Sequence, residues 1–213
     1  LPIPVISVLH GYCYGGGMQI ALAADFRIAT PDCEMSIMEI KWGMIPDMTG
    51  TVTLRELVPM DVAKELTMTG RLFTGEEAKA MNLVTRVATN PLEEAEKLAQ
   101  AIKTRSPDAI SASKALFQQS WNVPEAQAFD VESKLQFKML RSKNQRRAMQ
   151  ANTERRCVKR CDMLRQQCAY HPAENIAHAA TGHTGIAIIT EQYLLCVGNE
   201  TAIAFEHYRA AIA

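Results

Sequence analysis

The chain has 213 residues, and its 23 lysines and arginines balance its 23 aspartates and glutamates. A net charge of zero argues against long-range electrostatic binding to nucleic acid or to an anionic membrane, because such binding needs a basic excess. With 47% hydrophobic and 22% charged residues, the chain is also too apolar for intrinsic disorder. We therefore expect a globular protein with a substantial core and with neither a nucleic-acid nor a membrane partner.

The start of the chain resembles the interior of a domain. Residues 1–9 are apolar but lack the basic stretch and the small-residue cleavage site of a secretory signal. No apolar stretch reaches the ~20 residues of a membrane span. The best, residues 186–197, is short and contains Glu191 and Gln192. The sequence therefore predicts a soluble, cytoplasmic protein that begins in mid-domain.

Strand patterns dominate the first part of the chain. The β-branched apolar run at 4–10 predicts a buried strand. Three glycines at 15–17 follow it, and residues 18–24 have the composition of a helix. Further short strands are predicted at 26–29 and 35–38.

Helical patterns follow from Gly50 onward. Thr74 and Glu77 match a capping box, and Gly70 matches a helix stop. One brief strand is predicted at 84–87, and the predicted helices cover residues 51–57, 61–68, 75–81, 91–103, 106–119, 124–140 and 143–155. Strands first and helices last predict an α/β fold that ends in C-terminal α-helices.

Composition changes abruptly after Arg156. The following segment holds four of the six cysteines and four of the five histidines, namely Cys157, Cys161, Cys168, Cys196, His171, His178, His183 and His207. Its cysteine spacing lacks the close Cys-x2-Cys pairs of structural zinc sites, so we expect no metal. Because the chain shows no secretory signal, its six cysteines are expected to be reduced thiols and not disulfides. We divide the chain into a partial α/β core (1–90), a helical region of the same domain (91–156) and an unassigned tail (157–213). A shifted reading frame or a fused, non-native segment is one explanation of the tail.

The glycine triplet is the first candidate for chemistry. Glycines between a strand and a helix let backbone N–H groups approach a ligand closely, and a helix N-terminus favours negative charge. An oxyanion hole requires this arrangement, although a tight turn without function has the same sequence. The triplet lacks the spacing of a dinucleotide fold and the lysine of a phosphate loop.

Several motifs in one register carry a family resemblance. They are HGYCYGGGMQIALAADFRIA (10–29), MEIKWGMIPDMTGT (38–51), LTMTGR (66–71) and EAKAMNLV (77–84). The chain from Leu1 to about Arg155 resembles the crotonase superfamily of enoyl-CoA hydratases and isomerases. The resemblance implies a crotonase-like β-β-α spiral core, present in part because the family's front segment would precede Leu1.

The resemblance also implies roles for individual positions. Gly16 matches one of two backbone N–H donors to the thioester oxygen of an acyl-CoA, and the other would lie upstream of Leu1. Glu39 matches a general acid/base, whereas Gln19 stands where hydratases of the family carry a second glutamate. Asp47 matches an acidic position of the dienoyl-CoA isomerase branch. Without one oxyanion donor, which is worth ~10²–10³ in rate, this segment by itself is expected to be a poor catalyst.

The sequence leaves the reaction open between double-bond isomerisation by proton transfer and hydration of a 2-enoyl thioester. A glutamine cannot exchange a proton near neutral pH, so a two-carboxylate hydration is in doubt and proton shuttling by Glu39 is preferred. Gln19 is also explained as a helix surface residue and Asp47 as a turn residue. The other function class is a catalytically degenerate acyl-CoA-binding or assembly module.

The resemblance finally implies a substrate and an assembly. The substrate is an acyl-CoA thioester of fatty-acid metabolism, such as β-oxidation. Coenzyme A is then part of the substrate, and no metal or redox cofactor is expected. Family members of this kind assemble as homo-trimers or dimers of trimers.

Overall fold

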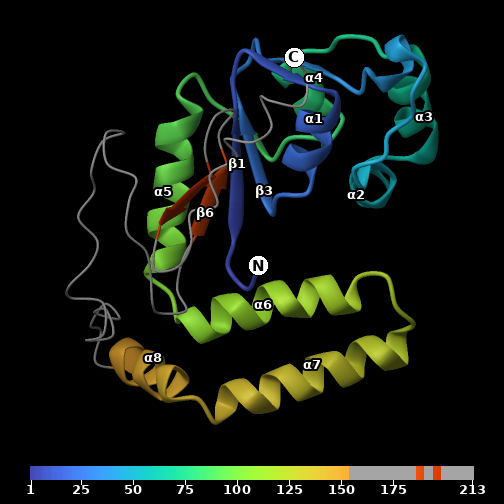
Figure 1. The fold of residues 1–213 in the computed structure, drawn as a ribbon. Coiled ribbons are helices and arrows are strands. Elements are labelled where there is room, and N and C mark those ends of the chain that lie inside the picture. Colours follow the sequence, from blue (N-terminus) through green and yellow to red (C-terminus); the bar gives the residue numbers. More distant parts are fainter. Residues whose placement is uncertain (154–185, 190–193, 198–213) are drawn as a thin grey trace. The chain divides into compact units, whose positions relative to one another are not determined.

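The computed structural model describes residues 1–153, 186–189 and 194–197. The chain forms two compact units, each described by itself below. We call the one built mainly from Val5–Glu96 the α/β unit, and the one built mainly from Lys97–Ile186 the helical unit. Figure 1 labels those of their helices and strands for which there is room.

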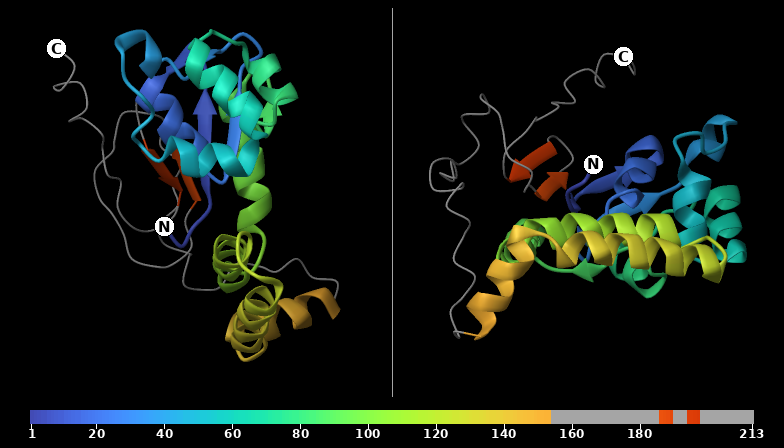
Figure 2. Two further views of the ribbon diagram at one scale, coloured as in Figure 1. Left: turned by 90° about the vertical axis from the view of Figure 1, so that its right-hand side faces the viewer. Right: turned by 90° about the horizontal axis from the view of Figure 1, so that it is seen from below.

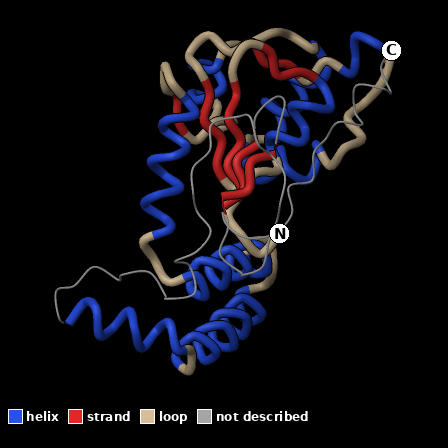
Figure 3. The backbone as a smooth tube through the Cα atoms, turned by 60° about the vertical axis from the view of Figure 1, so that its left-hand side comes forward, coloured by secondary structure: helices blue, strands red, loops and turns tan. Residues whose placement is uncertain are grey.

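The larger sheet is built around one fully buried strand. Its strand order among the described residues is β5-β3-β1-β6-β7, where the bounds are β1 Val5–Leu9, β3 Phe26–Ala29, β5 Arg86–Val87, β6 Ile186–Ile189 and β7 Leu194–Val197. β1 pairs in parallel with β3 on one edge and with β6 on the other, and Figure 3 shows these strands side by side. Burial of every β1 residue fits a central parallel strand.

β6 and β7 fall in the tail for which the sequence predicted no structure. The cysteines and histidines at 157–183 and His207 lie outside the described residues. The frame-shift explanation of this tail therefore stays a prediction, and so do the proposed domain boundaries.

A second, smaller sheet was only half predicted. It pairs β2 (Tyr12–Tyr14) in parallel with β4 (Glu34–Ser36), and Cys13 lies opposite Met35. The sequence predicted β4 within a residue or two but not β2. Three residues give too short a pattern to stand out beside a glycine triplet.

Helix α1 (Gly15–Leu22) begins earlier than the sequence predicted. The three glycines form its first turn and are not a loop before it. The hydroxyl of Ser7 on β1 donates to the carbonyl of Ala21 (3.3 Å), and the buried guanidinium of Arg27 on β3 donates to the carbonyl of Leu22 (3.2 Å). These contacts fix the C-terminal end of α1 against the sheet, and so they fix the direction of its first turn.

Further helices of the α/β unit lie between β4 and β5 in the chain. They are η1 Glu39–Trp42, α2 Gly50–Leu57, α3 Met60–Thr69 and α4 Gly75–Ala80. The expected capping box is confirmed, because Thr74 accepts from the Glu77 backbone while the Glu77 side chain accepts from the Thr74 backbone. The hydrophobic core of this unit contains Met18, Met35 and Leu66, all fully buried.

Long helices make up the helical unit. They are α5 Pro91–Lys103, whose first residues belong to the α/β unit, α6 Pro107–Ser120, α7 Glu125–Leu140 and α8 Lys143–Thr153. α6 packs along α7, as both views of Figure 2 show. Neither α6 nor α7 has a buried residue. None of the helices within the described ranges has the length and hydropathy needed to cross a membrane.

Candidate active site

A buried carboxylate and a buried amide form the centre of the candidate site. Glu39, the first residue of η1, is 7% exposed, and Gln19 on α1 is 1% exposed. Nε2 of Gln19 donates a hydrogen bond of 2.5 Å to Oε1 of Glu39. The two sequence candidates, twenty residues apart in the chain, are therefore in direct contact.

The other end of the Gln19 amide binds the backbone at the start of α2. Its Oε1 accepts hydrogen bonds from the N–H of Met48 (2.9 Å) and from the N–H of Gly50 (3.1 Å). Gln19 thus joins α1, η1 and the segment that leads into α2. The sequence offered a helix surface as one explanation of Gln19, and its burial rules that explanation out.

The second oxygen of the Glu39 carboxylate is available for chemistry. Oε2 is buried and has no hydrogen-bond partner among the described residues. A buried polar atom without a partner is costly, and such atoms gather where a ligand completes the site. Glu39 therefore offers one held oxygen and one oxygen that is ready to accept a proton.

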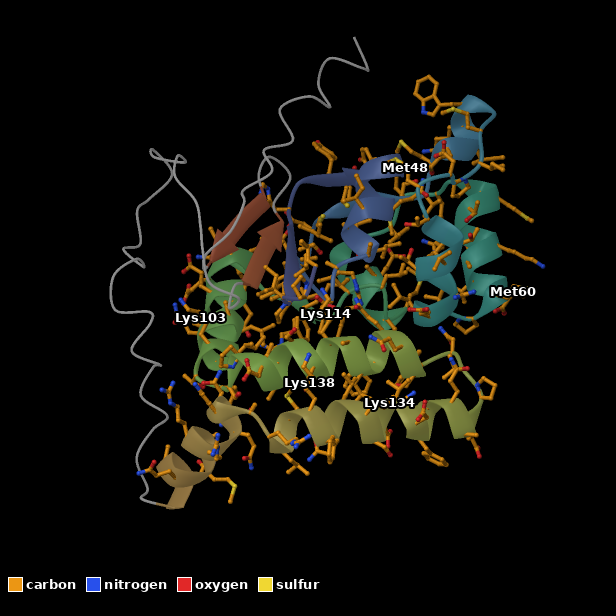
Figure 4. All side chains as sticks on the ribbon, turned by 60° about the horizontal axis from the view of Figure 1, so that its bottom comes forward. Met48, Met60, Lys103, Lys114, Lys134 and Lys138 are labelled. Carbon is orange, nitrogen blue, oxygen red and sulfur yellow. The ribbon has the colours of Figure 1, made fainter. Side chains whose placement is uncertain are left out.

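The first turn of α1 lies against this carboxylate. A methyl group added at Gly15 would lie 3.6 Å from Oε1 of Glu39, and one added at Gly16 would lie 2.8 Å from the sulfur of Met48. Met48, labelled in Figure 4, lies beside α1. Tyr14, the residue before the helix, gives no side-chain cap. First-turn N–H groups have no acceptor within their own helix. The N–H group of Gly16 is therefore suited to bind negative charge on a ligand.

Asp47 is not drawn into this group of contacts. Its side chain is exposed, and no hydrogen bond or ion pair joins it to Glu39, whose one side-chain partner in the described chain is Gln19. The sequence assigned it as a second acid/base group, and that role stays a prediction. A turn residue fits the same exposure.

Sequence reasoning missed the two backbone donors. The N–H groups of Met48 and Gly50 orient Gln19, but every non-proline residue carries an N–H group, so residue type gives no signal for them. What the sequence offered was their position: both follow Glu39 in the motif that carried the resemblance. In the sequence, Gly50 marks solely the start of a helical pattern.

The described residues hold no cluster suited to a metal. No group of three or more histidine, cysteine, aspartate or glutamate side chains within the described ranges is placed to bind a metal ion. Chemically, the site combines one proton acceptor with N–H donors at a helix N-terminus. This combination can remove a proton from a bound molecule and stabilise the anion that forms.

Comparison with known proteins identifies similar chains. The family model described as enoyl-CoA hydratase/isomerase matches residues 1–160. A carnitinyl-CoA dehydratase from Salmonella typhi is 35% identical over 128 residues, which are 59% of this chain and 49% of that protein. The homologous protein from Shigella flexneri is 34% identical over the same length. The chain spans about half the length of these curated relatives.

Solved structures show the same similarity in three dimensions. An enoyl-CoA hydratase from Bacillus anthracis superposes with a TM-score of 0.71 at 31% identity, covering 74% of this chain and 62% of that one. One from Mycobacterium tuberculosis superposes with a TM-score of 0.69 at 31% identity, covering 72% of this chain and 62% of that one. The predicted crotonase-like α/β core with C-terminal helices is thereby confirmed.

Proposed function

The chain belongs to the enoyl-CoA hydratase/isomerase family, and on this premise we propose that the full-length protein moves protons on an acyl-CoA thioester. The preferred reaction shifts a double bond between the 3-enoyl and 2-enoyl positions. The observation that carries the proposal is the state of Glu39, which is buried with Oε1 held by Gln19 and Oε2 unpartnered. Coenzyme A enters as part of the substrate, without a further cofactor.

The proposed reaction needs one base. Oε2 of Glu39 takes a proton from C2 of a 3-enoyl thioester, and the electron pair moves into a dienolate whose negative charge lies on the thioester oxygen. The N–H of Gly16 donates to that oxygen. Glu39 then returns the proton to C4, which gives the 2-enoyl thioester with all atoms conserved.

The contacts of Gln19 favour this reaction over hydration. Hydration adds a hydroxyl group at C3 and a proton at C2, and the family's hydratases use two carboxylates for these transfers. Gln19 stands at the second position, its Oε1 already accepts two backbone N–H groups, and an amide does not exchange protons near neutral pH. Asp47 is exposed, and within the described ranges no hydrogen bond or ion pair joins it to Glu39.

Hydration or dehydration of a 2-enoyl thioester is the second candidate. The observation that favours it is similarity: the relatives named above are a carnitinyl-CoA dehydratase and enoyl-CoA hydratases. In this reaction Glu39 would be the acid/base and Asp47 the group that positions water. A degenerate binding or assembly module is the alternative without catalysis, and it predicts acyl-CoA binding without turnover.

The decisive experiment is Glu39→Gln in the full-length protein. Purified enzyme is mixed with 2-enoyl, 3-enoyl and 3,5-dienoyl-CoA, and each conversion is followed by the absorbance of the conjugated thioester. Loss of a positioned general base predicts a fall in kcat of about 10²–10⁴-fold. Glu76→Gln removes a charge from an exposed position on α4 and is the matched control, with kcat unchanged.

The outcomes separate the candidates. Conversion of 3-enoyl-CoA that depends on Glu39 supports the isomerase, whereas turnover of 2-enoyl-CoA alone supports the hydratase. Binding of acyl-CoA by wild type without any turnover supports the degenerate module. If Glu39→Gln isomerises at the wild-type rate, the assignment of the base is wrong.

A further inference from the structure

The hydrogen bonds of Gln19 fix which way its amide points. Backbone N–H groups can only donate, so the atom that faces Met48 and Gly50 must be the amide oxygen. The amide nitrogen therefore faces Glu39, and it can only donate. Gln19 has one arrangement that satisfies these three contacts.

Close packing around the amide leaves little room for another arrangement. A methyl group added at Gly50 would lie 2.7 Å from Oε1 of Gln19 and 3.1 Å from Cβ of Pro46. Real Cβ atoms essentially never come as near as the first of these distances. The amide is thus held between α1 and the start of α2.

This arrangement differentiates the two oxygens of Glu39. A carboxylate that is free to rotate about its last bond offers either oxygen as a base. Donation from Nε2 of Gln19 occupies Oε1, so that Oε2, the atom without a partner, is the one left to react.

We propose that Gln19 is a positioning residue, which presents a single oxygen of Glu39 to the substrate and anchors the backbone at residues 48–50 to that base. The proposal rests on the proposed function, because it takes Glu39 as the base. Gln19 itself touches no reacting atom. Its effect on the rate passes through the orientation of Glu39.

Within the described part of the chain, no titratable side chain on the surrounding elements forms a hydrogen bond or ion pair with Gln19 or Glu39. Among the described residues, neither Gln19 nor Glu39 forms an ion pair, and their side-chain hydrogen bonds are the three given above. The titratable residues on the elements packed against α1 and η1, and on the segment between η1 and α2, are Tyr12, Cys13, Tyr14, Glu34, Lys41, Asp47, Arg55, Glu56, Asp61, Lys64 and Glu65.

Gln19→Glu tests the role through a pH profile. One oxygen of the new carboxyl group still accepts from the two backbone N–H groups, while the other faces Glu39 at hydrogen-bond distance. Two carboxylates this close share one proton and cannot both stay ionised without repulsion. At low pH the shared proton reproduces the donation of the amide, and at high pH it is lost.

The measured quantity is kcat for isomerisation across the neutral and alkaline range. For Gln19→Glu we expect a descending alkaline limb that wild type lacks. Above the pH at which the shared proton is lost, kcat should fall about tenfold per pH unit. A variant with the wild-type profile overturns the proposal, because a residue that merely anchors the backbone would keep its anchor in this variant.

Gln19→Met keeps the test decisive if the charged variant folds poorly. It preserves side-chain length but removes both the donor and the acceptor. We expect kcat to fall about 10- to 100-fold at every pH, with KM much less affected, because the base is misaligned. Wild-type kcat in a folded Gln19→Met variant also overturns the proposal.

Failure of this proposal can be told apart from failure of the proposed function. If Glu39→Gln is fully active, the base is misassigned whatever the Gln19 variants do. If Glu39→Gln is inactive while both Gln19 variants match wild type, Glu39 remains the base and the positioning role is wrong.

Discussion

Tyr14 connects the smaller sheet to the first turn of α1. It ends β2, and its hydroxyl donates a hydrogen bond of 2.6 Å to Oε2 of Glu34 on β4. This hydrogen bond and, to a lesser extent, burial raise the pKa of Tyr14 to about 12. The neutral phenol is therefore part of the structure that positions the glycines.

The raised pKa predicts a pH dependence of stability. An unfolded tyrosine ionises near pH 10, so the folded state holds its proton longer than the unfolded state. The contribution of Tyr14 is then fully present below about pH 10 and is lost as the pH rises toward 12. We expect Tyr14→Phe to lower the free energy of unfolding at neutral pH and to weaken this alkaline slope.

Denaturant unfolding at several pH values, together with ultraviolet titration of the phenols, measures both effects. Tyr12→Phe is the matched control, because it removes the neighbouring exposed phenol. Equal alkaline slopes in wild type and Tyr14→Phe would show that the hydrogen bond to Glu34 does not stabilise the fold.

The sequence predicted which positions belong to the candidate site, but it did not predict which of those side chains touch one another. The motif register singled out Gly16, Gln19, Glu39 and Asp47 from the sequence. That Gln19 touches Glu39 was not predictable, because the contact depends on two strands, β3 and β4, that return the chain to α1. Side-chain type carries information about chemistry, whereas contacts between distant residues depend on the whole fold.

Elements with strong local signals were predicted well. The capping box of α4 and the left-handed Gly70 after α3 are where the sequence placed them, and α5 has the predicted bounds. Short elements were missed: β2 has three residues and η1 has four. The start of α1 was misjudged because glycine is a poor helix former, and tertiary contacts override that preference here.

Gly75 at the start of α4 makes a contact that forbids a side chain. A methyl group there would lie 2.0 Å from the carbonyl oxygen of Thr30, a backbone atom that cannot move aside easily. We expect Gly75→Ala to destabilise the protein by about 1–3 kcal/mol. Chemical denaturation followed by circular dichroism measures the change.

The matched control lies in another helix. Gly17 is in the first turn of α1, and a methyl group there would meet nothing within 4 Å. Gly17→Ala is expected to be neutral or to stabilise by up to about 1 kcal/mol through helix propensity. A Gly75→Ala variant as stable as Gly17→Ala would mean that α4 shifts freely relative to Thr30.

At the scale of the whole molecule, the helical unit exposes large aromatic side chains. Phe117 on α6 and Trp121, directly after α6, are 58% and 66% exposed, and Phe129 and Phe137 on α7 are each 62% exposed. Groups of exposed apolar side chains are typical of interfaces. The family resemblance predicts a homo-trimer or a dimer of trimers, and these helices are the expected place of contact between copies.

Sedimentation of the full-length protein tests this assembly. We expect wild type to sediment as a trimer or a multiple of it, and Phe129→Glu together with Phe137→Glu to shift the distribution toward smaller species. Gln136→Glu, which adds a charge at an exposed position on α7, is the control. A wild-type protein that stays monomeric at all concentrations contradicts the prediction.

The two backbone N–H donors that bind Gln19 have a consequence for how such a site can evolve. The N–H groups of Met48 and Gly50 donate to the side-chain oxygen of Gln19, and they can donate equally well to an oxygen of a glutamate. Codons for these two amino acids differ by one nucleotide. A lineage can therefore exchange a one-carboxylate site for a two-carboxylate site in one mutational step, while the surrounding backbone keeps its anchor throughout.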